Sequence, residues 1–467
     1  MKGPHIKALA LLMFCLVGGR AWPCYTVVVG RNASVDGAVL VGHNEQNAGE
    51  RCVNFRKIPR MQYKAGDVVD LAAGGRLPQV PQTYAFLWSQ NVGLSFSDAY
   101  MNEWGVAVVS NGCPDRGEDL AQLEAAGQIR DGGIGYMLRR IVVQRARTAR
   151  QGVEIAGSII DEVGYSSSRT LVIADAREAW LLSMTRGRQW VAQRVPDDKV
   201  VLLPNVYIVN EVDLGDGENF LASDRLVDYA IEKGWWPANR TPFVFSEAYG
   251  RPREVLMDPR QRKGHSRVTG RDVPRLPDRR LSFAVAPAKK LAVRDVIRIL
   301  RNHEDVALCS ADTQEGAVFQ LRGNMPAAIG CVYWRTWGEP CTSVLTPWYA
   351  GASKVPPQCH EAVDVRTQLT LAYHFAQRRP EHAPDEMWAW SAFKGLQDRV
   401  NAGDITAAVK NRLFWDSFEA GFFAQQILVE KTAMDVYEND LAAAAMYLME
   451  YCSDIARTVL AEAVRRR

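Results

Sequence analysis

The sequence predicts an α+β fold in which stacked β-sheets are covered by helices. Strand-like runs come first, two strongly periodic helices follow, and three further strands come directly after them. This order is typical of sheets whose outer faces carry helices. The chain has 467 residues and 47% hydrophobic content, which is enough for a large core or two domains.

The first predicted element is a β-hairpin that begins directly after Cys24. Residues 25–29 and 38–41 are rich in β-branched and aromatic side chains, which favour strands. Asp36 and Gly37 lie between the two runs, and Asp-Gly is a strong signal for a hairpin turn.

The later elements follow from hydrophobic periodicity and turn residues along the chain. Runs of strand-forming residues predict strands at 84–92, 106–110, 170–174, 179–185, 190–194, 317–322 and 328–337. Helical spacing predicts helices at 131–147, 149–163, 223–233 and 293–302. From about residue 361 strand signals are absent, and helices are predicted at 363–377, 385–401, 404–430 and 435–463.

Residues 250–280 carry many arginines and lysines together with proline and glycine, and they show little hydrophobic periodicity. One interpretation is a solvated surface loop or insertion. The other is a basic lip that recognises an anionic substrate or a cell-surface polyanion. Composition favours the surface loop, and the basic lip remains the alternative interpretation.

Composition and motifs argue against several classes of function. The net charge of +3 gives no global reason to expect a nucleic-acid partner. The seven histidines are scattered, and the chain has no His-Glu-x-x-His, Gly-x-Ser-x-Gly, Cys-x-x-Cys or phosphate-loop pattern. We therefore expect no metal and no cofactor. Beyond the N-terminal segment, no apolar run is long enough to span a membrane.

The N-terminal segment has the features of a secretory signal. Lys2 and Lys7 flank its start, an apolar run follows at 8–17, and Gly19-Arg20-Ala21 offers small residues to a signal peptidase. We therefore interpret residues 1–23 as a signal peptide and short leader. We expect an exported protein that is periplasmic, cell-surface or extracellular.

A rival interpretation is lipid attachment at Cys24, because this cysteine follows the apolar run. Trp22 and Pro23 argue against it, since small residues are expected before a lipidated cysteine. A non-catalytic, lipid-anchored binding protein is the alternative from outside the enzymes.

The chain has nine cysteines, of which Cys15 is lost with the signal. Besides Cys24, this leaves an odd number, so at least one thiol stays free even where export permits disulfides. These cysteines are Cys52, Cys113, Cys309, Cys331, Cys341, Cys359 and Cys452. Cys331 and Cys341 flank an apparent hairpin and are the expected pair, although spacing does not fix the connectivity.

Cys24 is the candidate nucleophile, because cleavage before it would place a thiol and a free α-amine on one residue. The amine has an ordinary pKa of about 7.7–8.0, so part of it is unprotonated near neutral pH. It can then accept the proton of its own thiol, and the thiolate can attack an amide carbonyl to form an acyl-enzyme. The alternative role is a disulfide cysteine near a new N-terminus.

Short motifs extend from this hairpin to about residue 355. The first are Cys24-Tyr25-Thr26, Asp36-Gly37 and Gly42-His43-Asn44, and the later ones are Met101 to Ala107, Leu203-Pro204-Asn205, Ala222 to Leu226, Thr313-Gln314-Glu315 and Pro347 to Gly351. In this order they resemble the dipeptidase A family of cysteine N-terminal nucleophile (Ntn) hydrolases, which is related to secernins and choloylglycine hydrolases. The resemblance implies an αββα four-layer sandwich over residues 24–355, with 356–467 as a helical C-terminal segment packed on the core.

The resemblance also implies roles for residues near Cys24. Asn111 and Asn205 are similar in place to two asparagines that donate to the oxyanion in the related enzymes. The spacing between Asn111 and the motif before it differs by one residue from the spacing in those enzymes. The alternative for each is an ordinary turn asparagine. Arg225 is similar in place to a late active-site arginine, although a surface helix arginine is at least as good an interpretation.

His43, Asn44 and Gln46 lie where related enzymes carry Arg-Asn-x-Asp, which makes them candidate substrate-binding residues. The aspartate of that pattern holds the α-amine, and Gln46 can accept a hydrogen bond from the amine without a negative charge. A lower amine pKa is then expected, because no carboxylate stabilises the ammonium form. Strand alternation would point Glu45 to the other face.

Taken together, the sequence predicts an exported cysteine dipeptidase that cleaves short peptides through Cys24 and an acyl-enzyme after autocatalytic loss of its leader. The runner-up is an acyl-amide hydrolase of the choloylglycine or penicillin V type. The motifs at 313–315 and 347–351 favour the dipeptidase.

Overall fold

The computed structural model describes residues 24–47, 53–251, 258–275, 280–303, 306–376, 388–403 and 405–467. The predicted signal peptide and leader at 1–23, Cys52, and parts of the basic segment and of the predicted helices at 363–377 and 385–401 lie outside the described residues. Within the described part of the chain, no helix is long and apolar enough to cross a membrane.

Two antiparallel β-sheets form the centre of the molecule, with the order β18-β14-β1-β2-β19-β20-β21 in the first and β16-β13-β12-β11-β10-β9-β8-β3 in the second. The first comprises β1 (Tyr25–Val29), β2 (Val39–Gln46), β14 (Val200–Leu203), β18 (Ala284–Val285), β19 (Thr313–Leu321), β20 (Cys331–Arg335) and β21 (Thr346–Tyr349). The second comprises β3 (Val53–Ile58), β8 (Phe86–Asn91), β9 (Ala99–Asn102), β10 (Ala107–Gly112), β11 (Arg169–Ala174), β12 (Ala179–Met184), β13 (Trp190–Arg194) and β16 (Phe220–Ala222). One hydrophobic core contains side chains from the facing sides of both sheets.

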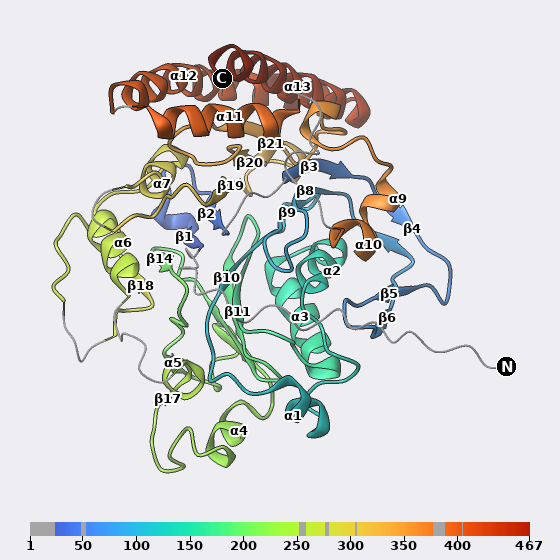
Figure 1. The fold of residues 1–467 in the computed structure, drawn as a ribbon, viewed down its shortest axis with the longest axis vertical. Coiled ribbons are helices and arrows are strands. Elements are labelled where there is room, and N and C mark those ends of the chain that lie inside the picture. Colours follow the sequence, from blue (N-terminus) through green and yellow to red (C-terminus); the bar gives the residue numbers. More distant parts are fainter. Residues whose placement is uncertain are drawn as a thin grey trace.

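Helices cover the outer faces of the two sheets (Figure 1). The first sheet is covered by α6 (Pro259–Thr269) and α7 (Val293–Leu300), and the second by α2 (Met137–Arg145) and α3 (Ala149–Val163). The predicted α+β class and αββα layering are therefore confirmed.

Short elements connect these layers. The short helices are α1 (Leu120–Ala125), α4 (Leu226–Glu232), α5 (Phe245–Tyr249), α9 (Val365–Gln368) and α10 (Leu371–His374). The short strand pairs are β4 (Met61–Gln62) with β7 (Gln82–Thr83), β5 (Val68–Asp70) with β6 (Arg76–Pro78), and β15 (Glu211–Val212) with β17 (Phe243–Val244).

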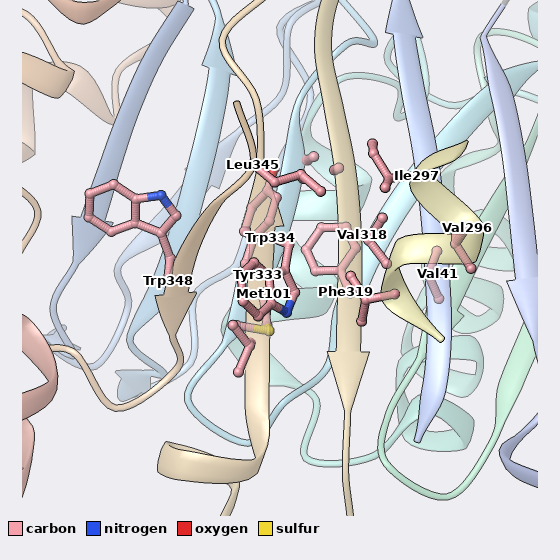
Figure 2. Close-up of a cluster of buried hydrophobic side chains, with 14 of the residues drawn as sticks. Val41, Met101, Val296, Ile297, Val318, Phe319, Tyr333, Trp334, Leu345 and Trp348 are labelled. Atoms are coloured by element: carbon pink, nitrogen blue, oxygen red, sulfur yellow. The ribbon is translucent and has the colours of Figure 1, made fainter. Parts of the chain in front are cut away.

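The C-terminal helices form an additional layer at one end of the sandwich (Figure 1). They are α11 (Ala389–Ala402), α12 (Ile405–Tyr437) and α13 (Leu441–Arg466), and they pack on β21 and on α8 (Ala327–Gly330). Figure 2 shows aromatic side chains of the neighbouring strands β19 and β20, where the rings of Phe319 and Tyr333 are 4.2 Å apart. Trp334 stacks on Phe423 of α12 at 4.3 Å, which joins the helical layer to the sheet.

The register of β1 on β2 decides which side chains enter the space between the sheets. Thr26 lies opposite His43, and Tyr25 lies opposite Asn44. Tyr25 points outward, since its hydroxyl donates to the Arg260 carbonyl of α6 at 3.1 Å. Gly42 also faces outward, where a Cβ would lie 2.3 Å from Val296 of α7. Glycine is therefore required for this close approach of helix and strand.

Residues 259–269 form helix α6, one face of which is buried. The interpretation of 250–280 as a solvated loop is therefore wrong for residues 259–269. Asp258 caps the helix by accepting from the amides of Arg260 and Gln261, and Pro259 occupies its first turn. Gly270 ends it in the left-handed region at φ 66°, a common helix terminus. The helix is polar even on its buried face, because Gln261 and His265 lie there beside Val268, and this composition concealed the helical periodicity.

The expected disulfide between Cys331 and Cys341 is wrong, because the two cysteines lie at opposite ends of β20. Cys331 begins β20 opposite Leu321, at the closed end of the β19–β20 hairpin. Cys341 lies beyond the other end of β20, in the segment before β21. An extended strand advances about 3.3 Å per residue, so the intervening strand holds the two sulfurs apart.

Candidate active site

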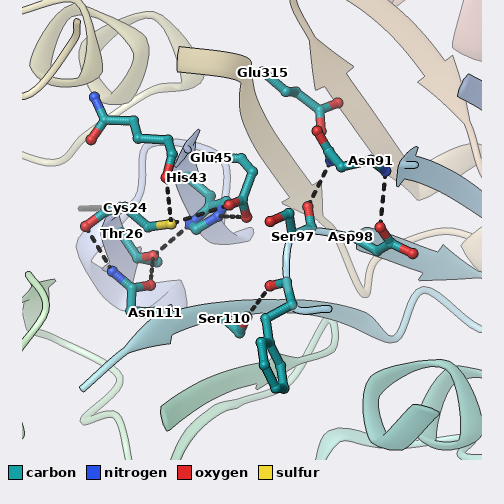
Figure 3. A network of polar contacts seen from close by, with 12 residues as sticks. Cys24, Thr26, His43, Glu45, Asn91, Ser97, Asp98, Ser110, Asn111 and Glu315 are labelled. Atoms are coloured by element: carbon teal, nitrogen blue, oxygen red, sulfur yellow. Dashed lines mark hydrogen bonds and ion pairs between the residues drawn. The ribbon is translucent and has the colours of Figure 1, made fainter. Parts of the chain in front are cut away.

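Cys24 lies directly before β1, in the space between the two sheets (Figure 3). One further step of the β1–β2 register places it opposite Glu45. Its thiol donates to Glu45 Oε1 at 3.3 Å and lies 3.8 Å from the Gln46 carbonyl oxygen. Cys24 is only 6% exposed, so the candidate nucleophile is held in place by the sheet.

The expectation that Glu45 would turn away from Cys24 was wrong. Directly opposite residues of an antiparallel pair share a face, and this rule brings Glu45 to the thiol. Its carboxylate also accepts from Asn47 Nδ2 at 2.6 Å and contacts His43 Nε2 at 3.2 Å. Glu45 is therefore a buried carboxylate with partners on both oxygens.

Asn44 and Gln46 turn their side chains to the opposite face of β2. Both donate to the carbonyl oxygen of Leu308, Asn44 at 2.6 Å and Gln46 at 3.3 Å. Gln46 also donates to the hydroxyls of Ser310 and Thr313. These two candidate substrate-binding residues thus fasten β2 to the segment that follows α7.

His43 belongs to a chain of hydrogen bonds that fixes its protons. Asn111 Nδ2 faces the carbonyl oxygens of Cys24, Leu203 and Pro204, so its Oδ1 is the atom that accepts from the Thr26 hydroxyl at 2.6 Å. Thr26 has one proton to give. His43 Nδ1, 2.8 Å from that hydroxyl, must therefore be the donor. Its Nε2 lies 3.2 Å from Glu45 Oε2, which links this chain of hydrogen bonds to the carboxylate beside the thiol.

The two predicted oxyanion asparagines meet around the main chain of Cys24. Asn111 Nδ2 donates to the Cys24 carbonyl at 3.1 Å. Arg260 donates to the same carbonyl at 3.3 Å and to Asn205 Oδ1 at 3.3 Å. Asn205 Nδ2 in turn donates to the Gly112 carbonyl at 2.8 Å. To be bound by Asn111, an oxyanion would have to replace one of its carbonyl acceptors, whereas the Gly112 carbonyl takes only one of the two protons of Asn205 Nδ2.

Arg169 is a further cation at the site, and sequence reasoning missed it. It begins β11 opposite Gly112, its guanidinium lies 4.1 Å from the Phe96 ring, and it donates to Ser110 Oγ at 3.3 Å. Burial raises the pKa of the Cys24 thiol, the Glu45 carboxylate raises it further, and the charge of Arg169 acts in the opposite direction. The Cys24 thiol is therefore protonated near neutral pH.

Arg225 lies away from this cluster. It precedes α4, is exposed, and forms an ion pair with Glu232 of the same helix. Figure 1 shows α4 at the far end of the second sheet from β1. The structure supports the interpretation of a surface helix arginine.

Cys24, His43 and Glu45 place a thiol, an imidazole and a carboxylate within 4.8 Å of one another. Zinc accepts ligands of these three types. The three side chains also satisfy one another through the contacts already described. The expected absence of a metal stays a prediction.

Residues 23–308 match the family model described as peptidase family C69. The chain belongs to peptidase family C69. It is 26% identical over 381 residues to a probable dipeptidase of Salmonella dublin, covering 75% of this chain and 86% of that protein. A probable dipeptidase B of Streptococcus pyogenes is 21% identical and covers 95% and 91%. The resemblance to the dipeptidase A family is confirmed, and these matches identify the chain as a peptidase.

Two further matches were found. A dipeptidase of Bifidobacterium longum is 25% identical over 413 residues, covering 76% of each chain. A solved mutant of conjugated bile acid hydrolase from Clostridium perfringens has 11% identity and a TM-score of 0.28 over 68% of this chain and 89% of that one. This structural likeness is too low to carry an argument.

The contact between Cys24 and Glu45 predicts how the thiol titrates. Glu45→Gln removes a negative charge that raises the pKa of Cys24, so the pKa should fall and more thiolate should form at a given pH. The rate of Cys24 alkylation by iodoacetamide, followed by peptide mass spectrometry from about pH 6 to 10, should shift to lower pH.

The matched control is Glu103→Gln, which removes a carboxylate paired with Arg60 outside the site. It should leave the alkylation profile of Cys24 in place. A profile that Glu45→Gln leaves unchanged, or moves to higher pH, contradicts the assigned role of this carboxylate.

Proposed function

We propose that this peptidase is an exported cysteine dipeptidase whose mature N-terminus is Cys24. The observation that carries the proposal is the thiol at the very start of β1, buried between the sheets and hydrogen-bonded to Glu45. Membership of family C69 and the relatives named as dipeptidases support the substrate class.

In the proposed reaction the α-amine of Cys24 takes the thiol proton, and the thiolate attacks the amide carbonyl of a dipeptide. A tetrahedral intermediate forms, the amine returns the proton to the leaving group, and an acyl-enzyme remains. The amine then activates water, which releases the acyl product and frees the thiol. Before the attack Glu45 accepts from the thiol, and the His43–Thr26–Asn111 chain holds the Cys24 main chain through Asn111 Nδ2.

The first test is a substrate panel on the purified mature protein. Dipeptides should release free amino acids, and EDTA should leave the rate unchanged, because the mechanism needs no metal. Loss of activity with EDTA and recovery with zinc would instead make Cys24, His43 and Glu45 metal ligands.

Two other outcomes of this panel decide between the alternatives. Hydrolysis of conjugated bile salts or penicillin V without dipeptide turnover assigns the chain to the choloylglycine type. Lipid on Cys24 with no turnover of any amide assigns it to the non-catalytic binding proteins.

Oxyanion stabilisation is proposed for Asn111 and Asn205. Asn111→Ala and Asn205→Ala should each lower kcat by roughly 10²–10³, the scale for losing one oxyanion donor. Asn439→Ala is the control, because the side chain of this exposed asparagine donates to the Asp435 carbonyl at its own helix end, away from Cys24. A variant with the parental kcat removes that asparagine from the role.

Maturation is the remaining part of the proposal. While Pro23 is attached, the nitrogen of Cys24 is an amide and has no lone pair to accept the thiol proton. Self-cleavage creates this base: the thiol attacks the Pro23 carbonyl, the acyl group moves from nitrogen to sulfur, and water releases the leader. The high pKa of Cys24 in the uncleaved chain makes this first attack slow.

Intact-mass spectrometry of the secreted protein tests the maturation step. The active enzyme should begin at Cys24, Cys24→Ala should be inactive and keep Trp22-Pro23, and Cys24→Ser should mature slowly. A fully active enzyme that begins at Trp22 contradicts the mechanism.

A further inference from the structure

A second cluster of reactive side chains lies at the open end of the β19–β20 hairpin, where the chain enters β19 and leaves β20. Cys309 Sγ and Cys341 Sγ are 3.8 Å apart. His303 Nε2 lies 3.0 Å from the sulfur of Cys341, and Glu339 Oε2 lies 3.6 Å from it. None of these four residues has a role in the proposed peptidase reaction.

The two cysteines lie on segments that the chain brings together only through the sheet. Cys309 lies between α7 and β19, and Cys341 lies between β20 and β21. Because β19 and β20 are antiparallel neighbours, the segment before β19 and the segment after β20 meet at one edge. Both positions are loops, so a side-chain rotation and a small loop shift can close the remaining distance to a bond of about 2.0 Å.

We propose that Cys309 and Cys341 form a disulfide in the exported protein, and that this bond staples the two loops at the open end of the β19–β20 hairpin. The oxidant is a second disulfide, either of a protein thiol oxidase or of a small molecule, in an oxidising compartment. The partner of Cys341 is thus Cys309, which is distant in sequence, and not Cys331.

Exposure decides the order of the steps. Cys309 is fully buried, whereas Cys341 is partly exposed, so the oxidant reaches Cys341 first. The Cys341 thiolate attacks one sulfur of the oxidant, which breaks that disulfide and expels one thiolate. The Cys309 thiol then gives its proton to the thiolate expelled in the first step and attacks the Cys341 sulfur of the mixed disulfide. The second thiolate leaves, and two electrons have passed from the protein to the oxidant.

The surroundings of Cys341 suit the attacking role. The thiol of Cys309 donates to it and His303 lies beside it, and these contacts lower the pKa of Cys341 to about 5. The contact with Cys341 raises the pKa of His303, as expected for an imidazolium beside a thiolate. Burial, and after it the contact with Cys341, raises the pKa of Cys309, so Cys309 is not the thiol that reacts first. Low-pKa, accessible cysteines next to a second cysteine are the ones that oxidise to disulfides.

A metal ion is the competing occupant, since thiol and imidazole ligands come together here. On tetrahedral zinc, a sulfur and a nitrogen ligand lie about 3.6 Å apart. The 3.0 Å between His303 Nε2 and the sulfur of Cys341 is shorter and fits a direct hydrogen bond. Glu339 is already bonded to Asn401 Nδ2 at 3.2 Å. The 3.8 Å between the two sulfurs would suit zinc, but the short His303 contact and the engaged Glu339 leave only the two thiols as ligands in place. The disulfide is therefore the favoured occupant.

The staple would also support the peptidase site from behind. Cys309 lies between Leu308, whose carbonyl accepts from Asn44 and Gln46, and Ser310, whose hydroxyl accepts from Gln46. These bonds hold the outer face of β2 beside Glu45. A disulfide at Cys309 therefore limits the motion of residues 308–310, to which Asn44 and Gln46 of β2 are hydrogen-bonded.

Thiol mapping of the full-length exported protein tests the proposal. The protein is quenched with acid, alkylated with N-ethylmaleimide under denaturing conditions and digested. The peptides of Cys309 and Cys341 should appear as one linked species without label, and reduction before alkylation should separate and label both. Reduction of the native protein should lower Tm by roughly 4 °C, the scale for opening a loop of this length in a chain of this size. Oxidised glutathione should restore both the link and the Tm.

Two variants complete the test. Cys331→Ser is the control and should keep the link. Cys341→Ser should label Cys309 and show the lower Tm, and reductant should lower its Tm no further. Labelling of both cysteines in the unreduced exported protein overturns the proposal. A disulfide that joins Cys309 or Cys341 to a different cysteine also overturns it. Binding of one zinc ion per chain, lost in Cys341→Ser, overturns it as well.

Discussion

The antiparallel register between β1 and β2 is the constraint on which the site depends. It sets Thr26 opposite His43 and, one step further, Cys24 opposite Glu45. A slip of one residue would turn the carboxylate toward α7 and bring amide side chains to the thiol instead. The outer strands hold this register, because β14 pairs with β1 and β19 pairs with β2 along its whole length.

Elements with strong local signals were predicted well from the sequence. Strand β1 and helix α3 occupy the predicted residues, since β-branched runs and helical spacing need no tertiary information. Helix α2 begins at Met137, later than expected. Asp131, Gly132 and Gly133 adopt positive φ values, which a regular α-helix does not contain. Helix α6 was missed, since its buried face is largely polar and its burial depends on packing against β14 and Tyr25.

The site was predictable only where a motif carried it. Cys24 and Asn111 meet as expected, because each lies in a recognisable strand motif. Arg169 and Arg260 could not be found, since an arginine reveals its partners only after distant strands and helices have paired. The cysteines follow the same rule: Cys331 is nearer to Cys341 in sequence, yet Cys309 is nearer in space.

Glu45 changes the electrostatic argument that the sequence suggested. With Gln46 in the place of an aspartate, no carboxylate was expected at the amine, and a lowered amine pKa followed. The register brings the Glu45 carboxylate to the Cys24 side of β2, so that expectation loses its basis. This carboxylate raises the pKa of the Cys24 thiol, and in the proposed maturation it would also favour the ammonium form of the new amine. In that proposal one buried negative charge opposes thiolate formation before cleavage and makes the new amine a stronger base after it.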